Sequence, residues 1–249
     1  MIGILEWFGD LAAFIGRTVS RAVKPPYEVQ QVLAQLDDIG TKSLPLVGAA
    51  GVAIGTVLAM QSRATLARFG AESLLPTMIS ISVVRELGPV IAGLMVAGRI
   101  GAGLAAELGS MRVTEQIDAM EVSATDPMNY LVVPRVLACV IAMPILTIYC
   151  DILAIGGGYL ASTLSMETSM RLYFDESMKI LEFIDVIPSV AKTAVFGFFI
   201  GIIGCFYGYT VRGGTAGVGR AATIAVVLSS LMVIVSDVVM VRITQVLFE

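Results

Sequence analysis

The stretch Ile81-Ser82-Val83-Val84-Arg85-Glu86-Leu87-Gly88-Pro89-Val90 lies inside an apolar run that extends from Leu74 to Ala106. A charge near the core of a bilayer costs at least ~2.5–3.5 kcal/mol, so charged residues there usually face protein or water. Neighbours on a helix point about 100° apart, and we therefore expect Arg85 and Glu86 to have separate partners or to face a wet cavity. Pro89 has no backbone N–H, so it leaves a carbonyl that protein or water must satisfy. These features predict that the functional core of the chain lies here.

The composition around this stretch is that of an integral membrane protein. Of the 249 residues, 57% are hydrophobic and only 14% are charged, whereas soluble domains have ~25% charged residues. The chain has no histidine, which excludes a His-based catalytic triad and zinc or haem ligation through histidine. The three cysteines lie in apolar segments without metal-ligand spacing, and we interpret them as small core residues. We expect no catalytic or metal site, and the net charge of −4 does not favour nucleic-acid binding.

Five apolar stretches are long enough to cross a bilayer, which needs about 20 helical residues. They lie at about 44–62, 74–106, 134–162, 187–210 and 221–247. Residues 27–42 before the first span are polar, and we expect a short link there. Glycines recur at packing spacing in the first span, as in Gly51-xxx-Gly55, and this pattern favours close contact with another helix. The predicted fold class is an all-α integral membrane protein with five transmembrane helices.

Residues 1–26 are predicted to form a separate amphipathic helix. The apolar residues on one side recur at helical spacing: Ile4, Phe8, Leu11, Ile15, Val19 and Ala22. Charged residues occupy the opposite side, and Pro25-Pro26 ends the helix. Such a helix lies in the membrane interface, with Trp7 and Phe8 as anchors. The alternative is a helix that packs on the protein and faces solvent.

Basic residues predict the orientation of the spans, because they are enriched on the cytoplasmic side. Those before the first span are Arg17, Arg21, Lys24 and Lys42. Arg112 and Arg135 flank residues 107–133, whereas the segment 163–186 is acidic. We therefore expect the N-terminus and residues 107–133 in the cytoplasm, and segment 163–186 and the C-terminus in the periplasm.

The sequence lacks a phosphate-binding loop. Gly40-Thr41-Lys42-Ser43 contains a Lys-Ser pair, but the upstream glycine and the glycine next to the lysine are missing. The glycine-rich residues 213–219 lack the lysine and are interpreted as a flexible turn. We therefore expect no cofactor in this chain.

Several stretches resemble the MlaE permease family, the membrane subunits of MCE-type ABC lipid transporters. They are Arg85–Val90, Ala97–Gly101, Ala106–Glu121 and Asp126-Pro127. On this basis residues 27–249 are identified as an MlaE-type permease domain. The resemblance implies a homodimer in which each subunit binds a cytoplasmic ATPase, and that ATPase would bind ATP and Mg. It also implies a periplasmic hexameric MCE-domain protein, a STAS-domain accessory protein and a phospholipid substrate.

The resemblance further implies a coupling helix within residues 107–133, which docks into the ATPase. The residues expected to fill its groove are Val113, Ile117 and Met120. Those expected to meet its basic rim are Glu115, Asp118 and Glu121. The residues alone equally allow an ordinary solvated loop helix.

A phospholipid cavity needs apolar walls for acyl chains and a few charges for a headgroup, and the resemblance places it between two permease copies. The candidate lining residues are Leu58, Gln61, Thr65, Phe69, Glu86, Leu87 and Lys192. Lys192 either pairs with Glu86, binds a lipid phosphate or extends to the interface. Glu86 is alternatively a structural partner of Lys192 or Arg99, and Asp237 then satisfies only a neighbouring span.

The leading hypothesis is an ABC permease subunit that moves phospholipids between the bacterial inner membrane and a periplasmic MCE route, which maintains outer-membrane lipid asymmetry. A long plastid-type transit segment is absent, which favours the bacterial inner membrane. The second hypothesis is an ion-coupled secondary carrier with Glu86 and Lys192 as a charge relay. Such carriers are often built from inverted repeats, and the pattern of spans shows none. A third is a membrane scaffold without transport.

Overall fold

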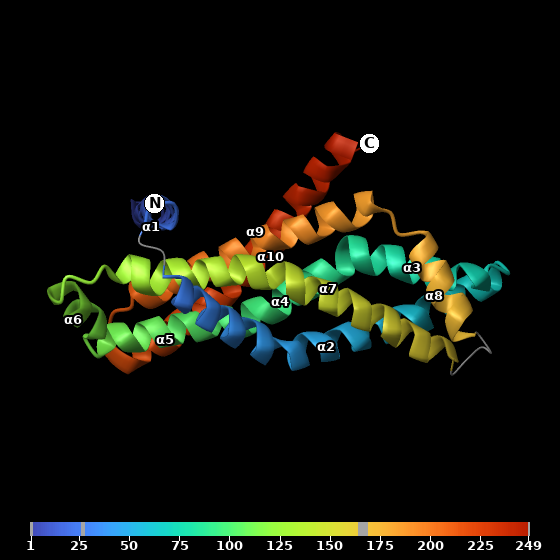
Figure 1. Ribbon diagram of the computed structural model, residues 1–249, viewed down its shortest axis with the longest axis horizontal. Helices are drawn as coiled ribbons and strands as arrows, with labels where there is room; N and C mark the ends of the chain where they lie inside the picture. The colour runs from blue at the N-terminus through green and yellow to red at the C-terminus, as the bar shows by residue number, and fades with distance from the viewer. Residues whose placement is uncertain (1, 26–27, 164–168, 249) are drawn as a thin grey trace. The chain divides into compact units, whose positions relative to one another are not determined.

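A computed structural model describes residues 2–25, 28–163 and 169–248, and the regular secondary structure in these ranges is helical throughout (Figure 1). The prediction of an all-α fold is therefore confirmed. Five helical stretches are long and apolar enough to cross a membrane, as predicted: Val29–Arg68, Glu72–Val113, Met128–Thr163, Phe183–Tyr209 and Gly214–Val246. Residues 26–27 at the predicted domain boundary, residues 164–168 of the predicted periplasmic segment and the side chain of Ile4 lie outside the described part.

The polar link predicted at residues 27–42 is instead the beginning of a helix. Helix α2 (Val29–Arg68) includes all of these residues from Val29 onward and continues through Pro45. Its first turns carry apolar residues at helical spacing, namely Val29, Val32, Leu36 and Ile39. Ile39 is only 1% exposed. The prediction was wrong because the polar residues between these positions lowered the average hydropathy and concealed the periodicity.

The chain divides into two compact units, each built from three stretches of sequence. Unit 1 comprises Met1–Lys42, Val96–Ala142 and Phe196–Val233, and unit 2 comprises Ser43–Met95, Met143–Val195 and Ile234–Glu249. The shorter elements of unit 1 are α1 (Ile2–Ala22), η3 (Ala97–Gly101), α5 (Ala102–Val113), α6 (Gln116–Val122) and η4 (Met128–Val132). Those of unit 2 are η1 (Glu72–Leu74), α3 (Leu75–Ser82), η2 (Val83–Leu87), α4 (Gly88–Val96) and α8 (Met170–Lys179). Four long helices contribute residues to both units: α2, α7 (Val133–Thr163), α9 (Phe183–Tyr209) and α10 (Gly214–Phe248). The last residue of α4, Val96, belongs to unit 1.

In unit 1, the amphipathic helix α1 packs against the end of α9. Phe14 of α1 is 1% exposed, and its ring meets that of Phe206 edge-on with centroids 5.5 Å apart. Trp7 Nε1 donates a hydrogen bond of 2.9 Å to the hydroxyl of Tyr207. Phe8, the other predicted anchor, is 59% exposed. The helix therefore combines a packed face with an exposed apolar edge, and its location in the membrane interface stays a prediction.

In unit 2, small residues bring α2 and α7 into close backbone contact. A Cβ atom on Gly55 would lie 1.8 Å from the carbonyl oxygen of Ala154, and one on Gly157 would lie 2.4 Å from that of Val52. Thr56 Oγ1 also donates a hydrogen bond to the Gly157 carbonyl at 3.2 Å. The packing predicted from the glycine spacing is therefore confirmed, and the two helices approach closely because these positions lack side chains.

Helix α8 covers another part of unit 2 and lies beside α3 (Figure 1). Its Tyr173 is fully buried and packs with Val84 of η2 and Ile155 of α7. The end of α3 and the start of η2 are thereby held between α7 and α8, next to the charged residues identified in the sequence.

Candidate functional site

The charged stretch of the second span forms a π-helical turn, η2. The N–H of Gly88 bonds the carbonyl of Val83, five residues earlier, and so does not pair with Val84 as it would in an α-helix. Pro89 has no N–H, so the carbonyl of Arg85, four residues earlier, also lacks its usual helical partner. Two neighbouring carbonyls therefore need donors from elsewhere.

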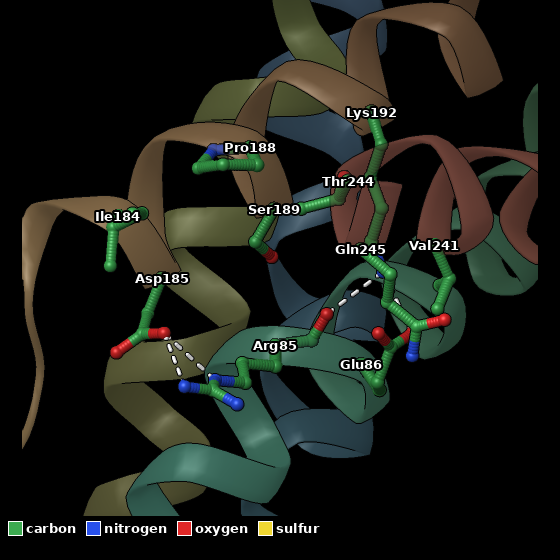
Figure 2. A pocket seen from close by; sticks show the side chains of 10 residues that line it. All are labelled: Arg85, Glu86, Ile184, Asp185, Pro188, Ser189, Lys192, Val241, Thr244 and Gln245. Atoms are coloured by element: carbon green, nitrogen blue, oxygen red, sulfur yellow. Dashed lines mark hydrogen bonds and ion pairs between the residues drawn. The ribbon is translucent and has the colours of Figure 1, made fainter. Parts of the chain in front are cut away.

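Helix α9 supplies both donors. Ser189 Oγ donates a hydrogen bond to the Val84 carbonyl, and Lys192 Nζ donates one of 2.8 Å to the Arg85 carbonyl (Figure 2). This confirms the prediction that the carbonyl freed by Pro89 requires a partner. Sequence reasoning missed Ser189. Its spacing of three residues from Lys192, which places both on one face of α9, was the available signal.

Arg85 and Glu86 have separate partners, as predicted. The Lys192 ammonium lies 2.8 Å from Glu86 Oε2 and 2.9 Å from Asp237 Oδ1 of α10. The Arg85 guanidinium lies 2.6 Å from Asp185 Oδ1 of α9. We call the Lys192 ammonium, the two carboxylates that it contacts and the Arg85 carbonyl the Lys192 cluster. Because the Lys192 side chain is only 6% exposed, the alternative in which it extends to the interface is wrong.

A pocket opens at this turn, lined from η2, α9 and α10 (Figure 2). Its volume is about 740 Å³, part of which is open to the surroundings. Both signs of charge line it, and Ile184, Pro188 and Val241 add apolar wall. The side chains of Arg85 and Glu86 are 53% and 45% exposed, so both remain accessible to a ligand although each has a partner. The pocket thus offers separate positive and negative groups beside an apolar surface.

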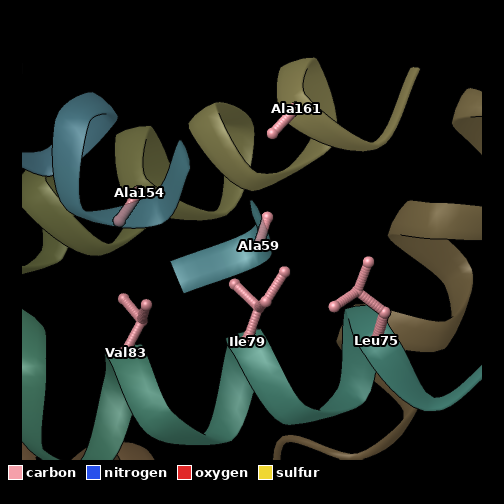
Figure 3. Packing of buried hydrophobic residues seen from close by; sticks show 6 residues of the cluster. All are labelled: Ala59, Leu75, Ile79, Val83, Ala154 and Ala161. Atoms are coloured by element: carbon pink, nitrogen blue, oxygen red, sulfur yellow. The ribbon is translucent and has the colours of Figure 1, made fainter. Parts of the chain in front are cut away.

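The predicted residues of the first span do not line this pocket. Gln61 and Thr65 are exposed on α2, and Phe69 is exposed in the turn that follows this helix. Leu58 packs against the apolar cluster of Figure 3. In that cluster Leu75, Ile79 and Val83 follow one another along α3 and the start of η2 and meet Ala59, Ala154 and Ala161. This pocket is therefore formed by η2, α9 and α10 and not between the first two spans, and the cavity predicted between two copies of the chain stays a prediction. Leu87 is half-buried outside the lining.

The predicted coupling segment forms the short helix α6 in unit 1. Ile117 is fully buried within its own unit, so the prediction that it fills a groove of another protein is not supported. Its role is to attach α6 to the rest of unit 1. Asp118 pairs with Arg112, and Glu121 accepts a hydrogen bond of 3.3 Å from the Tyr209 hydroxyl.

The exposed surface of α6 has a different composition from the predicted one. Glu115 is exposed, whereas Val113 and Met120 are half-buried. Val122, which was not predicted, is 89% exposed. The apolar contact that α6 can offer therefore lies at its C-terminal end.

Comparison with known proteins gives the class of this chain. The sequence profile of the family described as Permease MlaE matches residues 32–243. The chain belongs to the MlaE permease family. It is 46% identical over 229 residues to a probable ABC transporter permease protein of Rickettsia felis, an alignment that covers 92% of this chain and 88% of that protein. This relative is named as a permease of an ABC transporter, which disfavours the ion-coupled carrier hypothesis for this chain.

Two relatives with lower sequence identity carry names that mention the chloroplast or phospholipid transport. The protein Trigalactosyldiacylglycerol 1, chloroplastic, of Arabidopsis thaliana is 34% identical over 94% of this chain and 67% of its own length. The intermembrane phospholipid transport system permease protein MlaE of Haemophilus influenzae is 33% identical over 83% of this chain and 79% of its own length.

Proposed function

We propose that this chain is the membrane subunit through which an ABC transporter moves phospholipids. The observation that carries the proposal is the pocket at η2, where accessible Arg85 and Glu86 lie beside an apolar wall. A phospholipid headgroup needs charged partners, and its acyl chains need apolar surface. The name of the Haemophilus influenzae relative, which describes intermembrane phospholipid transport, supports the same substrate class.

The proposal includes the assembly implied by the family. The chain acts as a homodimer in the bacterial inner membrane, with its N-terminus in the cytoplasm and its C-terminus in the periplasm. Each copy binds a cytoplasmic ATPase that holds ATP and Mg, and a STAS-domain protein joins it. A hexameric MCE-domain protein receives or delivers lipid on the periplasmic side, and this route maintains outer-membrane lipid asymmetry. Hydrolysis in the ATPase moves α6, and the motion reaches the pocket through the helical stretch Glu72–Val113.

Glu86→Gln is expected to reduce ATP-dependent phospholipid transfer by about tenfold or more, because the headgroup loses a charged partner. Folding is preserved, since Lys192 retains Asp237 and the Arg85 carbonyl. The measurement is transfer of labelled phospholipid by the reconstituted complex. The matched control is Glu176→Gln on α8, which removes a carboxylate that pairs with the exposed Lys179. Unchanged transfer in a fully assembled Glu86→Gln complex contradicts the proposal.

Val122→Asp is expected to weaken binding of the ATPase by about tenfold or more, because it places a charge in the most exposed apolar position of α6. The measurement is co-purification of the ATPase with the tagged permease, followed by titration of the isolated subunits. Met170→Asp on α8, where the methionine is 59% exposed, is the control and should leave binding unchanged. If the Val122→Asp permease binds the ATPase as tightly as the wild type does, the docking surface does not include this end of α6.

A further inference from the structure

A buried carboxyl group of α7 has no role in the site described above. Asp151 is 6% exposed, and its Oδ1 has no hydrogen-bond partner within the described ranges. It lies against Gly88, the residue that follows η2, where a Cβ atom would be only 1.6 Å from Asp151 Oδ1. The carboxyl group therefore faces the backbone of the π-helical turn in a space from which even a methyl group is excluded.

The close contacts of the Lys192 ammonium are made with groups other than this carboxyl group. The ammonium donates hydrogen bonds of 2.8 Å to Glu86 Oε2 and to the Arg85 carbonyl. It also forms an ion pair at 2.9 Å with Asp237 Oδ1, which has no hydrogen-bond partner in the described ranges. Asp151 would be a third carboxylate near one ammonium. An ionised carboxylate that is buried without a donor is strongly disfavoured relative to the neutral acid.

We propose that Asp151 is a proton-binding site, protonated in the state described here, and that loss of its proton loosens the Lys192 cluster. The step is a simple acid dissociation in which the carboxyl O–H bond breaks and water takes the proton. The resulting carboxylate competes for Lys192 with Glu86 and the Arg85 carbonyl. Proton binding at Asp151 thus favours the π-helical turn in which Lys192 donates to the Arg85 carbonyl. Proton release favours a turn in which that carbonyl has lost its donor. This inference does not depend on which substrate is transported.

The groups around Asp151 have partners of their own or stay neutral. The charged and titratable residues near it in unit 2 include Arg85 and Glu86 on η2, Tyr173 on α8, Lys192 on α9, Asp237 on α10 and the adjacent Cys150 on α7. Arg85 is paired with Asp185, and burial raises the pKa of Tyr173 to about 12, so that its phenol stays neutral. Helix α2 faces this part of α7 with glycines, including Gly51 against the carbonyl of Cys150. Within the described ranges, Asp151 is therefore the carboxyl group in this surrounding that has neither a hydrogen bond to its buried oxygen nor an ion pair, whereas Glu86, Asp185 and Asp237 each have an ion pair.

The sign of the pH dependence follows from proton binding. The folded protein holds a proton on Asp151 at neutral pH, whereas the unfolded chain in water does not. Stability falls as pH rises wherever the folded state binds more protons. The unfolding temperature of the wild-type protein should therefore decrease by about 3 °C or more between about pH 6 and about pH 9.

Asp151→Asn tests the proposal, because asparagine has nearly the same shape as the neutral acid and cannot ionise. The full-length permease is purified in detergent, and the infrared carboxylic-acid C=O band is recorded together with unfolding temperatures over the same pH range. We expect the band to be present in the wild type and absent in Asp151→Asn, and the variant to be stable with a smaller pH dependence. The control is Asp185→Asn, which removes the carboxylate paired with Arg85 and should lower stability without changing the band.

Two results would overturn the proposal. One is a wild-type spectrum from which Asp151→Asn removes no protonated-carboxyl band. The other is an Asp151→Asn protein that is destabilised or fails to fold at the acidic end of the range, since this would mean that the native state requires the ionised carboxylate.

Discussion

Lys192→Met is expected to destabilise the permease by about 3 kcal/mol or more, the largest effect of any single side chain at the site. The substitution keeps most of the volume and apolar stem of lysine but removes its three donors. Glu86 and the Arg85 carbonyl then lose their hydrogen-bond donor, and Asp237 loses its ion-pair partner. Removing one partner of a buried ion pair typically costs ~3–5 kcal/mol, and the partial exposure of Glu86 places this case at the lower end. The measurement is the unfolding free energy in detergent, with transfer activity recorded in parallel.

Lys179→Met is the matched control for this substitution. Lys179 also pairs with a glutamate, Glu176, but its side chain is 69% exposed, so its loss should leave the unfolding free energy nearly unchanged. Combining Lys192→Met with Glu86→Gln and Asp237→Asn removes the two orphaned charges and should recover part of the stability without restoring transfer. A Lys192→Met protein as stable as the control would show that the Lys192 cluster does not hold η2.

Gly157→Ala is expected to cost about 2 kcal/mol or more, because its methyl group would overlap the backbone of α2. The predicted Cβ position is 2.4 Å from the Val52 carbonyl oxygen, and a backbone atom cannot rotate away. The two helices must separate, which weakens the packing around Gly55 and the hydrogen bond from Thr56 to the Gly157 carbonyl. Overpacking of this kind typically costs ~1–3 kcal/mol.

The adjacent residue provides a control on the same turn of the same helix. A Cβ on Gly156 meets no atom within 4 Å, so Gly156→Ala should be neutral or stabilising by up to about 1 kcal/mol through helix propensity. The comparison is made by unfolding in detergent and by assembly of the complex. Equal stability of the two variants would show that α2 and α7 are not in close contact at Gly157.

The sequence was sufficient to predict the features that depend on local chemistry. The charges of Arg85 and Glu86 in an apolar run, together with Pro89, indicated separate partners and a carbonyl in need of a donor, and both are observed. The glycine spacing of the first span likewise predicted close packing. These features follow from the cost of unpaired polar groups in a membrane and from the size of a single residue.

Features that depend on which helices meet could not be predicted in this way. The donor Ser189 and the partner Asp185 lie about 100 residues from η2 in sequence, and hydropathy does not reveal that contact. For the same reason Leu58 was assigned to a cavity wall, although it packs in an apolar cluster. Ile117 was assigned to an outer surface because of the family resemblance, although it is fully buried. The periodicity of a short helix shows that one face is apolar, but not whether that face meets its own chain.

The π-helical pairing of η2 determines how the second span can move. A π-turn holds one residue more than an α-turn over the same hydrogen-bonded loop, so it changes the angular phase between the helices on either side by about 100°. If Ser189 releases the Val84 carbonyl, the N–H of Gly88 can pair with it as in an α-helix, while the Arg85 carbonyl still needs Lys192 because Pro89 has no N–H. That change of pairing would rotate α4 about its own axis relative to α3 and carry the Arg85 and Glu86 side chains to a different face. The expected motion at this site is therefore a screw-like rotation of a helix rather than the bending of a hinge.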